Sequence, residues 1–187
     1  YQQLAKMTYQ SGSAAAIKVN SGKSTLAASQ WKNSKIDYGN LDSLNRTTTD
    51  TAYLSKANLG RSEGRTAQTW SPTGWHNQPI TVNGKRVYPQ NRGHLIAYTL
   101  SFNLTSDGKY RAGEDGSLDN PKNLATQTAY SNQKTMQIYE EQVRTALEQG
   151  KKVIYRVTTV FRGKDLMPRG YWSQAISTDG SVNFNVY

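Results

Sequence analysis

The stretch Tyr88–Leu100, YPQNRGHLIAYTL, decides how the rest of this chain is read. It holds His94, one of two histidines in 187 residues, and histidine is the side chain that titrates nearest to neutral pH. Gly93 permits a close backbone approach, and an apolar run, LIAY, follows, so we expect ordered structure to hold His94. On residue type alone, a catalytic base and a buried core histidine are equally good interpretations.

A β-hairpin is predicted just before this stretch. Two short segments with the alternating pattern of strands, Ile80–Val82 and Lys85–Tyr88, flank Asn83-Gly84, the dipeptide typical of a tight hairpin turn. The preceding WSPTGWH is punctuated by Pro and Gly and is expected to be a loop, which makes His76 a surface or structural histidine rather than a catalytic one.

Beyond this stretch, the pattern predicts a surface excursion over Thr105–Leu118 and then a segment, DNPKNLATQTAYSNQ, that leads into a long helix ending at Gly150. The apolar positions of the helix keep helical spacing: Met136, Tyr139, Val143, Ala146 and Leu147. Strands are expected over Lys151–Phe161 and in the terminal VNFNVY. The fold class is therefore α+β, with a central, mainly antiparallel sheet and flanking helices, in a single domain over 1–187.

The first part of the chain is less informative. AIKVN predicts a short strand, and DTAYLSKANLGRSEGR a short helix or turn ending near Gly60, with Arg61 and Arg65 displayed on a loop as candidate phosphate contacts or as solvated charges. VNSGKSTL matches only the end of a phosphate-binding loop, because Ile17 stands where the first glycine belongs, so we interpret it as a hairpin turn.

The composition favours some classes of partner and excludes some kinds of catalytic site. A net charge of +10 is spread along the chain, which favours polyanionic partners and nucleic acid above all. With no cysteine, thiol nucleophiles and zinc–thiolate sites are excluded, and no apolar run approaches the roughly 20 residues of a membrane span.

These residue types fit phosphodiester cleavage. Neutral His94 can act as general base, and Arg92, two residues earlier, offers a planar fork of donors to the same phosphate. Asn132 is a neutral oxygen ligand suited to Mg²⁺, while Asn123 and Glu140 are candidates for holding metal-bound water. Taken singly, an asparagine that caps a helix or a solvated helix glutamate is the better interpretation.

In combination, NRGHLIAY, a loop, NPKNLATQTAYSNQ and YEEQVRTALEQGKKVIYRV resemble the DNA/RNA non-specific endonuclease family of the ββα-metal (His-Me finger) type, from about Asn58 to the C-terminus. Within this family the sequence resembles in particular the secreted streptodornase-type DNases of Gram-positive cocci.

The resemblance implies a ββα-metal core over about 78–150 and specific roles: His94 as general base, Arg92 on the phosphate, Asn132 as metal ligand, and Asn123 and Glu140 in support. It also implies Mg²⁺-dependent hydrolysis to 5′-phosphate and 3′-hydroxyl ends, with Mn²⁺ as the alternative ion, and export from the cell. Asn91 stands where the family often has aspartate, which removes one charge beside the motif.

The alternative is a noncatalytic, basic nucleic-acid-binding or surface-adhesion module. The sequence leaves open whether RNA is cut as well as DNA, whether single strands are preferred, and whether a monomer, the favoured state, is the working form.

Overall fold

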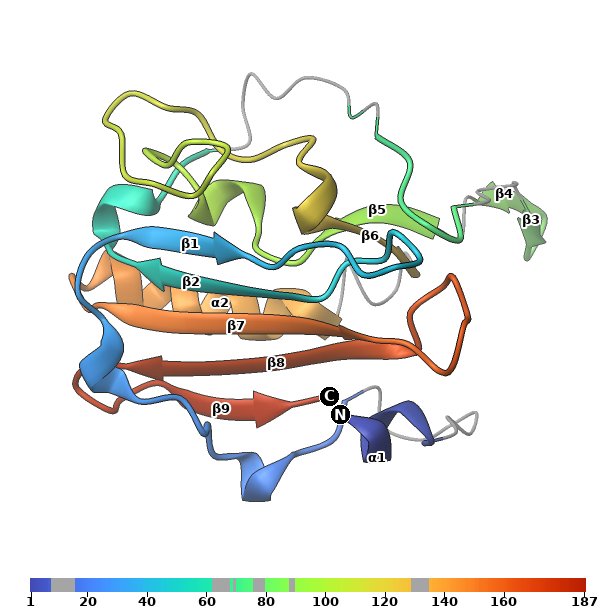
Figure 1. The fold of residues 1–187 in the computed structure, drawn as a ribbon, viewed down its shortest axis with the longest axis horizontal. Coiled ribbons are helices and arrows are strands. Elements are labelled where there is room, and N and C mark those ends of the chain that lie inside the picture. The colour runs from blue at the N-terminus through green and yellow to red at the C-terminus, as the bar shows by residue number, and fades with distance from the viewer. Residues whose placement is uncertain (8–15, 62–67, 69, 76–79, 88–89, 129–134) are drawn as a thin grey trace.

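A five-stranded antiparallel sheet forms the centre of the molecule (Figure 1). The computed structural model describes residues 1–7, 16–61, 68, 70–75, 80–87, 90–128 and 135–187. The strands are β1 (Lys35–Tyr38), β2 (Thr49–Leu54), β7 (Val153–Val160), β8 (Gly170–Ser177) and β9 (Asn183–Val186), and they pair in the order β1-β2-β7-β8-β9. The predicted α+β class with a mainly antiparallel sheet is confirmed.

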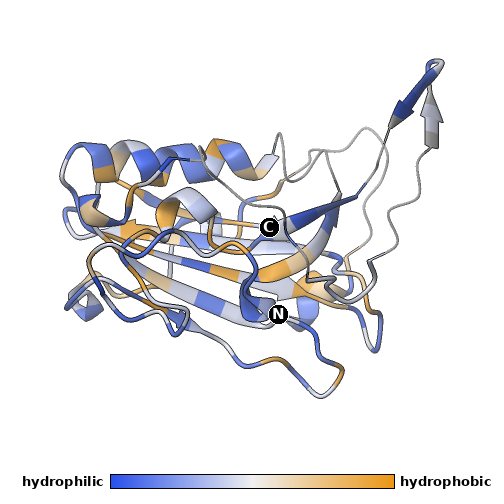
Figure 2. Ribbon diagram, turned by 90° about the horizontal axis from the view of Figure 1, so that it is seen from above, coloured by the Kyte–Doolittle hydropathy of each residue, from blue (hydrophilic) through white to orange (hydrophobic). Residues whose placement is uncertain are grey.

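The long helix α2 (Met136–Glu148) covers one face of this sheet (Figures 1 and 2). Its buried side chains, Met136, Val143, Ala146 and Leu147, belong to the same core as Val153, Tyr155 and Val157 of β7. Gly150, with φ at +82°, follows the helix in the left-handed conformation that ends helices readily. Both the predicted helix and the predicted strand over 151–161 are confirmed.

A separate pair of antiparallel strands, β5 (Gln90–His94) and β6 (Leu124–Thr128), lies beside the central sheet (Figure 1). The Tyr171 hydroxyl on β8 donates to the Thr126 carbonyl oxygen at 2.7 Å, which ties β6 to the central sheet. In chain order β5, β6 and α2 supply the two strands and the helix of the predicted ββα arrangement, within the predicted core of about 78–150.

The predicted hairpin is present as β3 (Ile80–Val82) and β4 (Lys85–Val87). Asn83 and Gly84 have φ values of 51° and 77°, which is the pair of positive angles that a type I′ turn requires. Both views show this ribbon standing away from the body of the molecule (Figures 1 and 2). Tyr88, its predicted last residue, lies outside the described residues.

The helix or turn expected from Asp50 is wrong over its first part, because Thr49–Leu54 is strand β2. β2 pairs with β1 on one side and β7 on the other, and almost every one of its residues is buried. A strand covered on both faces has no polar alternation, so the period-2 signal is missing. A 3₁₀ turn, η3 (Lys56–Asn58), follows it.

The short strand expected at AIKVN is present only in part. Lys18 forms an isolated bridge with Val186, and Ile17 and Val19 make backbone hydrogen bonds with Tyr187 and Asn185 beside β9. The turn after it, η1 (Asn20–Gly22), leads along the sheet instead of into a hairpin. The Ser24 and Thr25 hydroxyls donate to Gln174 Oε1 on β8, at 3.4 and 2.9 Å. The GKST residues therefore anchor the N-terminal segment to the sheet.

The remaining helical elements are single turns: α1 (Gln2–Ala5), η2 (Ala28–Gln30), η4 (Tyr98–Leu100) and η5 (Pro121–Asn123). None of the helices in the described parts of the chain has the length and apolar character needed to cross a membrane.

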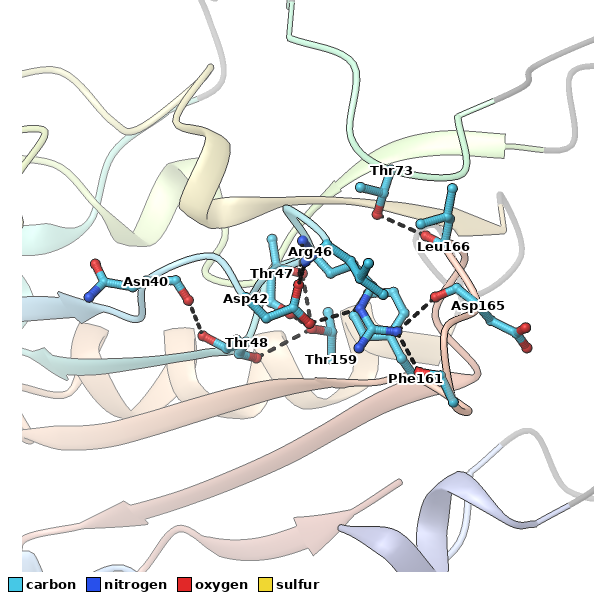
Figure 3. A network of polar contacts seen from close by, with 12 residues as sticks. Asn40, Asp42, Arg46, Thr47, Thr48, Thr73, Thr159, Phe161, Asp165 and Leu166 are labelled. Atoms are coloured by element: carbon cyan, nitrogen blue, oxygen red, sulfur yellow. Dashed lines mark hydrogen bonds and ion pairs between the residues drawn. The ribbon is translucent and has the colours of Figure 1, made fainter.

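Arg46 joins two connections of the central sheet (Figure 3). Its Nε lies 2.8 Å from Asp42 Oδ2, Nη1 donates to the carbonyl oxygens of Gly163 and Asp165, each at 2.9 Å, and the guanidinium lies 4.5 Å from the centre of the Phe161 ring. The β1–β2 and β7–β8 connections are thereby held together.

Candidate active site

His94 is the last residue of β5 and pairs with Leu124 of β6. Its side chain is only 8% exposed, and Nε2 lies 2.8 Å from the carbonyl oxygen of Leu118, in the loop before η5. Gln68 Nε2 donates to the same oxygen at 3.2 Å and lies 3.4 Å from His94 Nε2. The ring is thus held in one orientation from two distant segments.

This contact determines which ring nitrogen of His94 can act as a base. A carbonyl oxygen can only accept a hydrogen bond, so Nε2 carries the proton that is shared with Leu118. In the neutral ring the lone pair is then on Nδ1. The geometry therefore suits general-base chemistry at Nδ1.

Gly93 is required by the close approach of the two strands. A Cβ placed on Gly93 would collide with the Gln127 side chain, which reaches across from β6. Gln127 is 1% exposed, and its Nε2 lies 2.7 Å from Met136 Sδ at the beginning of α2. The glycine before His94 thus allows β5, β6 and α2 to pack closely, as the sequence predicted.

Arg92 is two residues before His94, so the two side chains lie on the same face of β5. Its Nε donates to the carbonyl oxygen of Trp70 at 2.9 Å, and its guanidinium lies 4.4 Å from the centre of the Trp75 ring. Among the described contacts its two terminal nitrogens have no partner, so they remain to bind an anion.

Asn123 is fully buried and braces the backbone that follows His94. Its Oδ1 accepts from the Ile96 N–H at 2.8 Å, its Nδ2 donates to the Ile96 carbonyl at 2.9 Å, and its own carbonyl accepts from the Leu95 N–H at 2.9 Å. The described contacts give Asn123 a positioning role, and the predicted contact with metal-bound water stays a prediction.

Glu140 lies one turn into α2 and is partly buried. Burial raises the pKa of its carboxyl group to about 7; the charge of Arg144 opposes this rise, and that of Glu141 adds to it. Arg144 also donates to the Thr99 hydroxyl in η4, which ties α2 to the chain beyond His94. A desolvated carboxylate of this kind is stabilised by an additional positive charge.

Two predicted site residues, Asn132 and Arg65, lie outside the described residues, as does His76. Arg61 is exposed beside Gly60, whose N–H donates to the Thr99 carbonyl at 2.9 Å. Asn91 lies on the opposite face of β5 from Arg92 and His94, and its Nδ2 donates to the Gln90 carbonyl at 3.1 Å. Within the described parts of the chain, no three His, Cys, Asp or Glu side chains are grouped to hold a metal.

The model of the DNA/RNA non-specific endonuclease family matches residues 23–177. The chain belongs to this family. The match begins earlier than the sequence resemblance, which started at about Asn58, and it includes β1 and β2 of the central sheet.

Solved structures agree with this assignment. NucA from Streptococcus agalactiae is 33% identical with a magnesium ion bound and 32% identical without metal, with TM-scores of 0.75 and 0.74. In both cases the match covers 90% of this chain and 76% of NucA. Sda1 nuclease with a bound zinc ion shares the fold, with 22% identity and a TM-score of 0.64 over 81% of this chain and 72% of Sda1. The predicted class, an endonuclease acting on nucleic acid, is confirmed.

Sequence reasoning missed the residues that surround His94. The Leu118 carbonyl is a backbone atom and leaves no trace in residue type, and Gln68 belongs to no motif. Trp70 stood in the loop WSPTGWH, where two tryptophans in six residues were the signal that could have indicated a binding surface. Asp119, the residue after Leu118, accepts from the Trp70 N–H at 2.7 Å and so joins the Trp70 segment to the loop that contacts His94.

Proposed function

We propose that this protein is a divalent-metal-dependent endonuclease that hydrolyses phosphodiester bonds to 5′-phosphate and 3′-hydroxyl ends, with His94 as the general base. The observation that carries the proposal is the 2.8 Å contact of His94 Nε2 with the Leu118 carbonyl, which leaves Nδ1 as the basic nitrogen beside Arg92. DNA is the proposed substrate, RNA is left open, and a monomer is the proposed working form.

His94 Nδ1 takes a proton from the attacking water as the water oxygen forms a bond to phosphorus. The terminal nitrogens of Arg92 bind a phosphate oxygen and stabilise the negative charge that develops there. The bond from phosphorus to the 3′ oxygen breaks as that oxygen takes a proton from a solvent water, so that it leaves as a hydroxyl, and His94 returns its own proton to solvent. General-base assistance alone is worth about 10² to 10⁴ in rate.

Mg²⁺ is the proposed ion, with Mn²⁺ as the alternative, and Asn132 is the proposed protein ligand. The raised pKa of Glu140 fits such an ion, because a nearby cation would favour the carboxylate form. NucA from Streptococcus agalactiae, at 33% identity, has been observed with magnesium bound. When bound, the ion would supply Lewis-acid stabilisation of phosphate charge. Arg61 and Arg65 are proposed to bind flanking phosphates.

Export from the cell is also part of the proposal, because the sequence resembles secreted streptodornase-type DNases. Immunoblots of culture medium and washed cells test it: most of the protein in the medium supports export, and retention in the cells contradicts it.

Plasmid cleavage tests the catalytic proposal. Wild type and His94→Ala are compared with Mg²⁺ and with EDTA, at pH 6 and pH 8. Wild type should cut only with metal, and faster at pH 8, where a histidine of ordinary pKa is neutral. His94→Ala should be slower by at least about 10². Equal rates for the two proteins would contradict the proposed role of His94. Cleavage in EDTA would contradict the proposed requirement for a divalent metal ion.

A further inference from the structure

One large apolar side chain is exposed at the edge of the candidate site. Trp70 is 40% exposed, whereas Trp31, Trp75 and Trp172 are each more buried. The other exposed large hydrophobic residues of the described chain are Tyr1, Met7, Tyr110, Ile138 and Leu166. Covering an indole ring is energetically favourable, so an exposed tryptophan beside a reactive group often marks a binding site.

The backbone of Trp70 is fixed on both sides. Its N–H donates to Asp119 Oδ1 at 2.7 Å, and its carbonyl accepts from Arg92 Nε at 2.9 Å. The backbone of Trp70 is therefore held in place before any ligand binds, so that a partner covering the ring orders little further backbone.

The contacts of Trp70 and of Gln68 connect this part of the chain with both the proposed phosphate-binding group and the proposed base. Arg92 contacts the Trp70 carbonyl directly, and Gln68, two residues earlier, reaches His94. If the terminal nitrogens of Arg92 bind a phosphate, the base of the same nucleotide would lie near Trp70, since Arg92 contacts Trp70 directly. The face of the Trp75 ring is already used by Arg92, at 4.4 Å.

We propose that Trp70 stacks on an unpaired nucleobase next to the phosphate bound by Arg92, so that this enzyme binds single-stranded or locally opened nucleic acid through both phosphate and base. The inference rests on the proposed function, because it uses the same bound phosphate. Every base has a face that can stack on an indole ring, so this contact adds affinity without sequence preference. In a duplex that face is covered by neighbouring base pairs, so the contact requires an unpaired base.

Fluorescence anisotropy in EDTA, where no cleavage occurs, tests the stacking directly. Two labelled oligomers of equal length are compared, one of thymidine nucleotides and one of abasic deoxyribose phosphates. Trp70→Ala should weaken binding of the thymidine oligomer about ten-fold, within the range known for base–aromatic stacking, and leave the abasic oligomer unchanged. Trp70→Phe should retain most of the affinity. Tyr110→Ala removes an aromatic side chain that is 53% exposed elsewhere, and should change neither affinity.

Equal loss for the two oligomers, or no loss for either, would overturn the proposal. Unchanged affinity for the abasic oligomer also shows that Trp70→Ala keeps its fold, since both hydrogen bonds of Trp70 come from the backbone. A wild-type protein that binds the thymidine oligomer through Trp70 but leaves plasmid intact with Mg²⁺ would overturn the proposed function alone. The two failures are therefore distinguishable.

Discussion

His94 Nε2 contacts a backbone carbonyl, Leu118 O at 2.8 Å, and the same oxygen accepts from Gln68. A carbonyl sets the tautomer of the ring without the full negative charge that a carboxylate would bring. No side-chain substitution at position 118 removes this acceptor, so the orientation of the base depends on the conformation of the loop before η5. At the scale of single residues, the orientation and tautomer of His94 are therefore determined by neighbours that take no part in the reaction.

Gly93→Ala should lower both stability and activity. The added Cβ would collide with the Gln127 side chain, and overpacking of this kind costs about 1–3 kcal/mol in the free energy of unfolding. Urea denaturation measures the loss, and plasmid cleavage measures the effect on His94. Adding Gln127→Ala should restore part of the stability, because it removes the atoms in closest contact. A Gly93→Ala protein as stable as wild type would show that β5 and β6 approach less closely.

Glu140→Gln should change how stability depends on pH. The pKa of Glu140 is raised from its ordinary value of 4.5 to about 7, so folding favours the protonated form. This contribution to stability is present below pH 4.5 and is lost as the pH rises to about 7. Glutamine cannot ionise, so the Tm of the variant, measured in EDTA, should gain on that of wild type between these pH values and then level off. A constant Tm difference would contradict the raised pKa.

At the scale of elements, the connections of the central sheet support the site. The Arg46 contacts hold the β7–β8 connection, where the Leu166 carbonyl accepts from the Thr73 hydroxyl at 2.8 Å (Figure 3). The Thr73 carbonyl in turn accepts from the Thr126 hydroxyl on β6 at 2.9 Å. The turn that presents Trp75 to Arg92 is thereby supported from the far end of the sheet.

Arg46→Lys should destabilise the protein by about 1.5–3 kcal/mol, the range for hydrogen bonds that involve a charged group. Lysine can keep the ion pair with Asp42, but it lacks the planar group that reaches the Gly163 and Asp165 carbonyls and stacks on Phe161. Urea denaturation checks this prediction. Lys164→Ala, an exposed change in the same connection, is the matched control and should have the midpoint of wild type. Equal midpoints for all three proteins would show that the Arg46 contacts add no stability.

At the scale of the whole molecule, the net charge of +10 should make cleavage strongly dependent on salt. Phosphates bound by lysine and arginine release counterions, and each contact contributes a slope of about −0.9 to log affinity against log salt for duplex DNA. kcat/KM for plasmid should therefore fall about ten-fold or more between 50 and 200 mM NaCl, at constant Mg²⁺.

A small chromogenic phosphodiester serves as the control for this salt dependence. It bears a single charge and has no flanking phosphates, so its hydrolysis should change little over the same salt range. Equal salt dependence for the plasmid and the small substrate would show that the dispersed positive charge does not bind nucleic acid.

The sequence alone determined those elements whose signal is local. The Asn83-Gly84 hairpin follows from the need for two positive φ angles, α2 from its helical spacing, and β7 from its run of β-branched and aromatic residues. The order of NRGH and the helix beyond it also led to the family.

Only the tertiary structure decided what surrounds His94. Strand β2 is covered on both faces, so its sequence does not alternate between apolar and polar residues. Strand β6 pairs with a strand 30 residues away. Neither strand was therefore identified from the local pattern. The partners of the base, the Leu118 carbonyl and Gln68, come from segments about 25 residues to either side of it. Backbone atoms and long-range contacts carry no residue-type signal, and the folded chain alone brings them together.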